Sequence, residues 1–187
     1  MRLVSFVVVF ALVSSVALAQ TIWQHRVYKD MGFSVDFPVD PKNPNNIAIE
    51  DGVYTASEAD DGPKSKAPAR IYTVTLPTAI YKVTVADFSK QADDGATLLG
   101  EAVDYLTNTE NLRVDTSARI GNRAAAVYGR DLTYDRKDGS RSTLGFFFTK
   151  GKLYVIEAII LPTHDGGDVG SPDAARFQQS LCLFAQC

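Results

Sequence analysis

The sequence predicts an α+β domain built on a single antiparallel sheet, with one long central helix and a C-terminal helix packed on it. Three observations support this class. Residues 124–161 form three strand-like segments joined by tight turns. Residues 84–108 carry an apolar stripe at helical spacing, and a second such stripe follows Ser171. Hairpin-linked strands with segregated helices are typical of α+β folds.

The three consecutive strands form the centre of the predicted sheet. They read AAAVYGRDLTYD, SRSTLGFFFTK and KLYVIEAIIL. Asp138-Gly139 and Lys150-Gly151 lie in the two turns, where glycine adopts positive φ without steric cost. The last strand is apolar almost throughout from Leu153 to Leu161, so we expect it to be covered on both faces.

Other segments show the alternation of half-buried strands. Phe33, Val35 and Phe37 share one face of a strand that Pro38 ends. Further strands are expected at residues 23–29, 47–50, 71–76 and 112–120. The polar segment 58–68 is expected to be a surface loop between two of them.

Both helices have recognisable start signals. Thr84 is the expected N-cap of the long helix, with the Asp87 carboxylate near the positive end of the helix dipole. Gly95 and Gly100 each disfavour this helix by about 1 kcal/mol, so packing on the sheet must hold it. Ser171-Pro172-Asp173 begins the second helix with a cap and a first-turn proline. The apolar residues of this second helix are Ala174, Phe177, Leu181 and Phe184.

The first 19 residues have the pattern of a secretory signal peptide. Arg2 precedes the apolar run Leu3–Val16, and Ala17-Leu18-Ala19 matches the small-residue cleavage site, with Gln20 as the new N-terminus. The run is shorter than the roughly 20 residues of a membrane-spanning helix, which disfavours an uncleaved anchor. A lipid anchor is disfavoured because no cysteine lies at the cleavage site.

Residues 20–187 are therefore expected to form a single exported domain, periplasmic or secreted and without a membrane anchor. Cleavage leaves 168 of the 187 residues, enough for one core, and changes the net charge from −3 to −4. The charges are mixed along the chain. The sequence contains no basic stripe or polybasic run, which argues against nucleic-acid binding and against an anionic membrane partner.

Cys182 and Cys187 lie together near the end of the chain. In an exported protein, two cysteines favour one intrachain disulfide. This disulfide would hold only the tail, because the loop it closes is short. The C-terminal helix should end between the two cysteines, since one continuous helix would hold them too far apart. A redox pair is the alternative, although the spacing is not CxxC.

The order of elements and several short strings resemble the PsbP-type domains of the photosystem II extrinsic subunit and their Mog1-like relatives. The strings are GFSVDFP, the glycine-led strand 121–134, KLYVIEA and FQQSL, within residues 28–184. Many exported bacterial proteins look similar. The resemblance implies an antiparallel sheet flanked by helices and a role as an accessory or binding module. It carries over no catalytic residue, and nothing in the chain marks a photosynthetic role.

Few residues of the chain are candidates for catalysis. Two histidines with no cluster of well-spaced ligands do not make a zinc site, and GxSxG, P-loop and Rossmann patterns are absent. No cofactor, metal or catalytic residue is predicted. His164-Asp165 with Asp168 and Asp173 is the group most like a site, as a metal loop or a general base beside an acid. Alternatively, it is a solvated glycine-rich connection that caps the last helix.

Glu157 is a lone carboxylate inside the apolar string VIEAII. Burial without a partner would raise its pKa and make it a candidate acid. The alternatives are a solvent-facing position, or an ion pair with Arg130 or Arg141 on the adjoining strands.

Aromatic side chains gather in the three central strands. Three consecutive phenylalanines, 146–148, must place at least one ring on the face opposite the other two. An open second face would form an apolar groove for a peptide, a lipid or a partner; otherwise both faces are core. The predicted ligand-binding residues are Glu157, Arg130, Tyr128 and Tyr154.

These observations favour a non-catalytic exported accessory or binding module with a protein or small-molecule partner. Two alternatives stay open. One is an enzyme of unknown class that uses the His164-Asp165 loop, and the other is a structural protein of the cell envelope.

Overall fold

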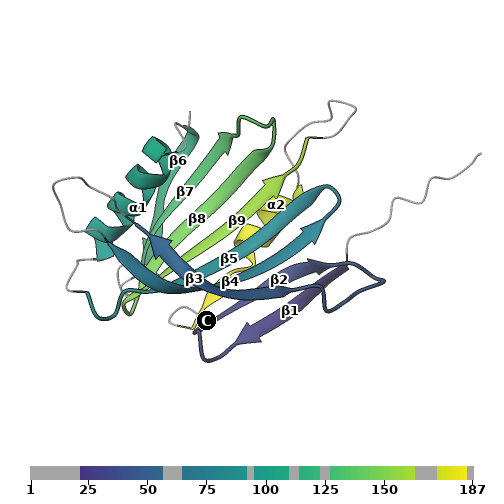
Figure 1. The fold of residues 1–187 in the computed structure, drawn as a ribbon, viewed down its shortest axis with the longest axis horizontal. Coiled ribbons are helices and arrows are strands. Elements are labelled where there is room, and N and C mark those ends of the chain that lie inside the picture. Colours follow the sequence, from purple (N-terminus) through teal and green to yellow (C-terminus); the bar gives the residue numbers. More distant parts are fainter. Residues whose placement is uncertain are drawn as a thin grey trace, which may run out of the picture.

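The computed structural model describes residues 22–56, 65–91, 95–109, 114–122, 127–162 and 172–184. Figure 1 traces the helices and strands in these ranges. The strands are β1 (Ile22–Tyr28), β2 (Phe33–Val39), β3 (Ala48–Thr55), β4 (Lys66–Leu76), β5 (Ala79–Asp87), β6 (Val114–Asn122), β7 (Val127–Asp135), β8 (Arg141–Thr149), β9 (Lys152–Ile160) and β10 (Cys182–Leu183). The helices are α1 (Gly95–Thr109) and α2 (Pro172–Gln179).

Seven strands form one antiparallel sheet in the order β3-β4-β5-β9-β8-β7-β6. The predicted three-strand unit is confirmed as β7, β8 and β9, and its turns have the expected geometry. Gly139 has φ 82°, while Lys150 and Gly151 have φ 50° and 75°. β9 lies between β5 and β8 and is buried from Leu153 to Ile159, which confirms that it is central and covered on both faces.

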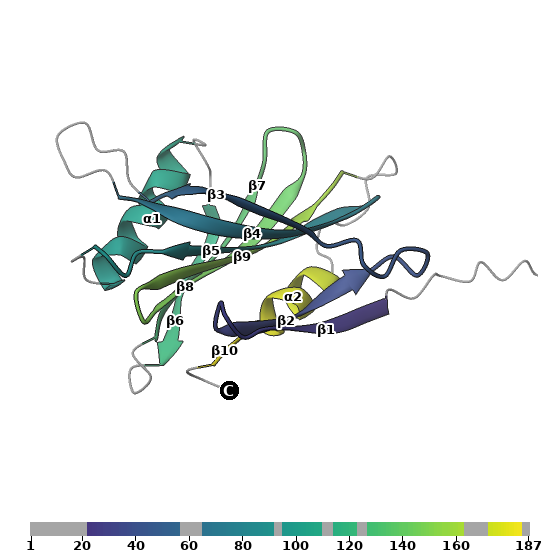
Figure 2. The ribbon, with the colours of Figure 1, turned by 60° about the horizontal axis from the view of Figure 1, so that its bottom comes forward.

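The prediction of a single sheet is wrong, because β1, β2 and β10 form a second, three-stranded sheet in the order β1-β2-β10. Figure 2 shows this small sheet and α2 on one side of the large sheet. Six of the seven residues of β2 are buried. Alternation identifies which side chains share a face, but it does not say which strand pairs with which. The pairing of Cys182 with Ser34 is invisible to local patterns.

The long helix is shorter than predicted and starts later. β5 continues to Asp87, so Thr84 does not cap a helix, and α1 begins at Gly95. Thr84 is paired with Ile71 on one side and Val155 on the other. The β-branched run around Thr84 suits a pleated strand, and both of its edges are occupied. The predicted second helix is confirmed as α2, although it ends at Gln179, before both cysteines rather than between them.

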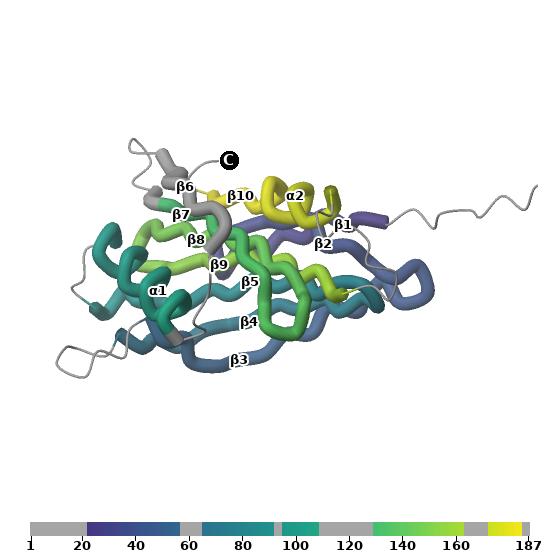
Figure 3. Tube along the Cα trace, turned by 90° about the horizontal axis from the view of Figure 1, so that it is seen from above, coloured from purple at the N-terminus to yellow at the C-terminus, as the bar shows by residue number. Residues whose placement is uncertain are grey.

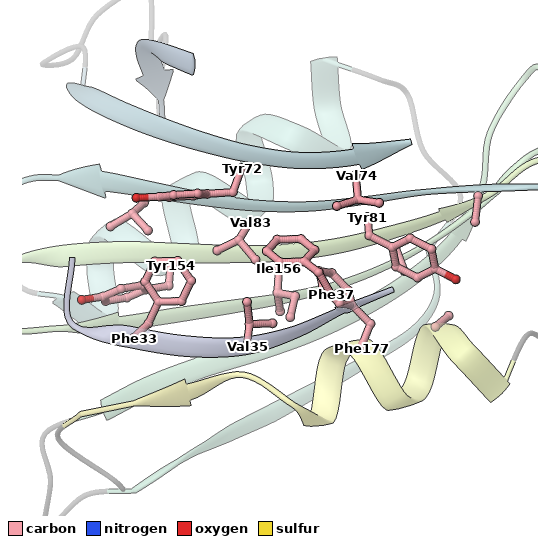
Figure 4. Packing of buried hydrophobic residues seen from close by; sticks show 14 of the residues in the cluster. Phe33, Val35, Phe37, Tyr72, Val74, Tyr81, Val83, Tyr154, Ile156 and Phe177 are labelled. Carbon is pink, nitrogen blue, oxygen red and sulfur yellow. The ribbon is translucent and has the colours of Figure 1, made fainter. Parts of the chain in front are cut away.

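Two cores lie on opposite faces of the large sheet. Figure 4 shows Phe33, Val35 and Phe37 along β2 in the first core, with Phe37 beside Phe177 of α2. The second core lies under α1, and Figure 3 shows α1 and α2 on opposite sides of the sheet. Each fully buried large apolar side chain contributes about 1.5–3 kcal/mol. Phe146 and Phe148 pack in the α1 core and Phe147 in the other, so both faces are core at this point.

Candidate functional site

Glu157 lies at the centre of β9 with only 4% of its side chain exposed. Its Oε2 is 2.5 Å from Lys82 Nζ, and its Oε1 is 2.6 Å from Arg136 Nη2. The Ser142 hydroxyl donates to Oε1 at 3.4 Å and accepts a hydrogen bond from Arg136 Nε at 2.6 Å. Each carboxylate oxygen therefore has its own cation.

The strand register brings these groups together. Lys82 lies directly opposite Glu157 in the β5–β9 pairing. Arg136 follows β7, and its guanidinium lies 5.7 Å from the ring centre of Tyr134 and donates to the Tyr134 hydroxyl at 3.3 Å. Burial raises the pKa of Tyr54, and the Glu157 carboxylate raises it further. Glu157, Lys82, Arg136 and Ser142 form one cluster of ion pairs and hydrogen bonds, which connects β5, β9, β8 and the end of β7. We call it the Glu157 cluster.

The expected ion-pair partners of Glu157 are wrong. We predicted Arg130 or Arg141, whereas the structure places Lys82 and Arg136 against the carboxylate. Arg141 instead pairs with Asp135 at 3.5 Å. Arg130 lies on the same face as Glu157 and opposite Phe146 in the β7–β8 register, where it is half-buried. The sequence correctly indicates that β8 pairs with β9 on one side. It does not indicate that β5 pairs with β9 on the other side and supplies Lys82.

Tyr154 lies on the opposite face of β9 from Glu157, so these two predicted ligand-binding residues do not meet. Its hydroxyl donates to the Met31 carbonyl at 2.9 Å, and its ring packs edge-on against Phe33 at 6.2 Å. Burial raises the pKa of Tyr154 to about 12, and Asp87 contributes to the increase. Tyr154 thus holds the β1–β2 turn against the large sheet.

The other predicted groups fall outside the described parts of the chain. They are the side chain of Tyr128, the His164-Asp165 loop with Asp168, the cleavage site at Ala19 and Gln20, and Cys187. Cys182 lies in β10. Its disulfide with Cys187 stays a prediction.

Two adjoining hollows lie between β1 and β3, and the sequence does not predict them. Each has a volume of about 460 Å³, and both are lined by Val27, Tyr28 and Ile49. One continues to Arg26, and the other continues to Tyr72. Val27 is 50% exposed and Ile49 is 55% exposed. Two isolated apolar residues carry no signal in the sequence, because their proximity depends on how the small sheet docks.

A third hollow of about 260 Å³ lies between the β1–β2 turn and the β8–β9 turn. Tyr154 is one of its walls, so one of the predicted ligand-binding residues does reach a hollow. Its polar lining residues come from both turns, and they are Lys29, Asp30, Thr149, Lys150 and Lys152.

Among the described residues, no three histidine, cysteine or acidic side chains are grouped so that they could hold a metal ion. None of the helices in this part of the chain combines the length and the apolar character needed to cross a membrane.

No family model matches the sequence, and no curated protein does. Among solved structures, the chain is similar to cyanobacterial PsbP (CyanoP) from Synechocystis sp. PCC 6803, with a TM-score of 0.51 and 9% identity. The match covers 92% of this chain and 98% of that one. A protein of unknown function from Pseudomonas aeruginosa aligns at a TM-score of 0.37 and 8% identity, over 75% and 83% of the two chains. The chain therefore has a PsbP-type fold, as its sequence strings suggested.

Proposed function

We propose that the chain is an exported, non-catalytic binding module that takes an extended segment of a partner protein along the free edge of β1. The observation that carries this proposal is the pair of adjoining hollows between two edge strands, β1 and β3. Export rests on the signal-like segment that ends at Ala19.

The strand arrangement favours an extended occupant. Within the described residues, β1 pairs only with β2 and β3 only with β4, which leaves one backbone edge of each without a strand partner. An added strand would satisfy the free N–H and C=O groups of such an edge. Val27 and Ile49 are both half-exposed beside this edge and would receive apolar side chains from alternate positions of the incoming segment.

The polar groups beside the hollows fit a peptide. Arg26 Nη2 donates to the Pro44 carbonyl at 3.1 Å, but Arg26 Nε is buried without a partner in the described residues. The Arg26 Nε donor is thus unsatisfied, and the carbonyl of an incoming peptide unit supplies an acceptor.

The non-catalytic part of the proposal is motivated by Glu157. A buried carboxylate serves as a general acid or base when it has a proton to exchange with substrate. Both oxygens of Glu157 are instead engaged by cations from β5 and from the end of β7. This arrangement favours a structural role for Glu157.

The proposal is tested with a displayed library of random 12-residue peptides selected on the purified processed protein. We expect selected peptides to shift the NMR amide signals of β1 and to slow hydrogen exchange along its free edge. Ile49→Glu should abolish binding. Val53→Glu is the matched control, because Val53 lies on the same strand, is 70% exposed and lines neither hollow. Peptides that bind the Ile49→Glu protein equally well, or that map elsewhere, would overturn the proposal.

A further inference from the structure

We infer that the hollow between the β1–β2 turn and the β8–β9 turn binds a small organic anion with an apolar body. This site shares Lys29, Asp30 and Met31 with one of the two hollows of the proposed peptide groove, and its other seven lining residues lie outside both hollows. It would exist whether or not a peptide adds to β1, because its walls come from β8, β9 and β10 as well as from the first hairpin. We call it the two-turn pocket.

The walls of the two-turn pocket are held by bonds between distant parts of the chain. The Tyr154 hydroxyl donates to the Met31 carbonyl at 2.9 Å, and the Phe184 amide donates to the Gly32 carbonyl at 3.1 Å. Gly32 has φ 81°, and the backbone at Lys150 also has positive φ, so both turns are tight. A pocket with walls fixed in this way loses little conformational entropy when a ligand enters.

Positive charge dominates the rim. Lys29, Lys150 and Lys152 all line the two-turn pocket, and within the described residues none of them forms an ion pair. The nearby acids are Asp30 in the lining and Asp87, which lies opposite Lys152 in the β5–β9 register. The lining thus contains three lysines and one aspartate, in a chain with a net charge of −3. Lysine binds phosphate and carboxylate oxygens as a point charge, so an anion would relieve the repulsion among them.

Thr149 provides a second, independent observation. It is only 3% exposed and lines the pocket, and its Oγ1 is buried with no hydrogen-bond partner in the described part of the chain. Buried polar atoms without partners are rare, and such an atom commonly marks a site that a ligand or water completes. A hydroxyl donates readily to an anionic oxygen. The unsatisfied atom therefore lies beside the same cations that would attract the anion.

The remaining walls explain why the ligand should carry an apolar body. Met31, Tyr154, Leu183 and Phe184 line the pocket, and Phe184 is 43% exposed. A volume of about 260 Å³ holds roughly nine water-sized groups at about 30 Å³ each. This space suits a phosphate or carboxylate group joined to one ring or a short chain.

The test is an NMR titration of the purified processed protein with phenyl phosphate. We expect saturable shifts at the amides of Gly32, Gly151 and Phe184 with a Kd below about 1 mM. Inorganic phosphate should bind at least several-fold more weakly, and benzyl alcohol should not shift these amides. Vesicles that contain phosphatidylglycerol distinguish the source of the anion. Sedimentation with vesicles, reversed by phenyl phosphate, would indicate a lipid headgroup, whereas binding of phenyl phosphate alone would indicate a free ligand.

Matched variants locate the site. Lys150→Asn with Lys152→Gln should weaken phenyl phosphate at least tenfold; asparagine is chosen because it tolerates positive φ. Thr149→Val, which removes only the hydroxyl, should weaken binding several-fold without loss of stability. Lys42→Gln with Lys137→Gln removes the same charge from exposed positions outside the pocket and should leave the Kd unchanged.

Three results would overturn the inference. The first is a set of NMR shifts that do not saturate, and the second is a set that maps to another surface. The third is an equal loss of affinity in the Lys42 and Lys137 control, which would show that binding depends only on net charge. The Ile49→Glu variant separates this site from the peptide groove. It should abolish peptide binding and leave the Kd for phenyl phosphate unchanged.

Discussion

Glu157 illustrates how one buried charge is tolerated in the middle of an apolar strand. Its carboxylate is enclosed, but the side chains of Lys82 and Arg136 are 32% and 27% exposed. The cations therefore keep part of their hydration while they neutralise the carboxylate. Burying an ion pair gives little net stability, but removing one partner leaves an uncompensated charge, which is costly. The role of Glu157 is thus better measured by breaking the cluster than by counting its contacts.

Glu157→Gln should lower the free energy of unfolding by about 2 kcal/mol, measured by urea denaturation at neutral pH. Loss of one member of a fully buried pair costs about 3–5 kcal/mol, and the partial exposure of both cations reduces this figure. Lys82→Met is the matched control. It leaves Glu157 with Arg136 and should cost less than half as much. Equal losses of unfolding free energy for the two variants would contradict this role of the Glu157 cluster.

Two aspartates in the β7–β8 region should affect stability with opposite signs. Burial raises the pKa of Asp131, whose Oδ1 accepts a hydrogen bond from Gln178 Nε2 at 3.2 Å. Hydrogen bonds from the Ser140 hydroxyl and amide, at 2.6 and 2.9 Å, lower the pKa of Asp138. The folded state thus binds the Asp131 proton more tightly than the unfolded chain does, and the Asp138 proton less tightly.

Asp131→Asn should therefore stabilise the protein at neutral pH and have little effect at about pH 3. Stability associated with Asp131 falls as pH rises from the unfolded pKa through the raised folded pKa, and asparagine removes that loss. Asp138→Asn should do the reverse. It should destabilise at neutral pH, and the difference should shrink as pH falls through the lowered pKa. Urea unfolding at both pH values tests the pair, and effects of the same sign at neutral pH would contradict the assignment.

At the scale of elements, α1 shows how two glycines in one helix can differ. A Cβ on Gly95 would overlap the Phe148 ring, whereas a Cβ on Gly100 would meet nothing within 4 Å. Gly95 is thus a contact point where the helix lies close to β8. Gly100 carries only the propensity cost of a helical glycine.

Gly95→Ala should destabilise the protein by about 1–3 kcal/mol, because the Phe148 ring must leave its packed position. Gly100→Ala should stabilise it by about 0.4–1 kcal/mol, because alanine restricts the unfolded chain and suits a helix. Thermal unfolding of the two variants side by side is sufficient. A stable Gly95→Ala protein would mean that α1 is not seated against β8 as described.

Local patterns predicted most strands but misassigned β5. The segment Thr84-Val85-Ala86-Asp87 has the spacing of a helix cap, but it overlaps the β-branched run Val83-Thr84-Val85. Pairing on both edges resolves this ambiguity. One of the two partner strands is β9, about 70 residues further along the chain. The residues around Thr84 do not identify this partner strand, so the local pattern predicts a helix that begins too early.

The candidate sites were predictable only in part, for the same reason. Glu157 was identified because a carboxylate inside VIEAII is unusual, but its partner Lys82 required the register of β5 with β9. Tyr154 was identified as one of several aromatics, and it does line the two-turn pocket. The pocket itself depends on the pairing of β10 with β2. A two-residue strand at the end of the chain has no periodicity to detect.

At the scale of the whole molecule, the large sheet separates two cores. The small sheet and α2 cover one face, and α1 covers part of the other, as Figure 2 shows. Phe177 anchors the first core, with ring centres 5.3 Å from Phe37 and 5.1 Å from Tyr81. Leu98 is fully buried in the second core. Both proposed binding sites lie on the small-sheet side, so the stability of the first core should govern them.

Truncation of each core should give a distinct local response. Phe177→Ala should cost about 3–5 kcal/mol and Leu98→Ala about 2–5 kcal/mol. In hydrogen exchange, Phe177→Ala should expose the amides of β1, β2 and β10 well before those of α1, because these strands reach the large sheet through the first core. Leu98→Ala should expose α1 first and leave the two-turn pocket able to bind phenyl phosphate. If both variants increase amide exchange uniformly, the two cores unfold as one unit. The stability of the binding sites then does not depend on the first core alone.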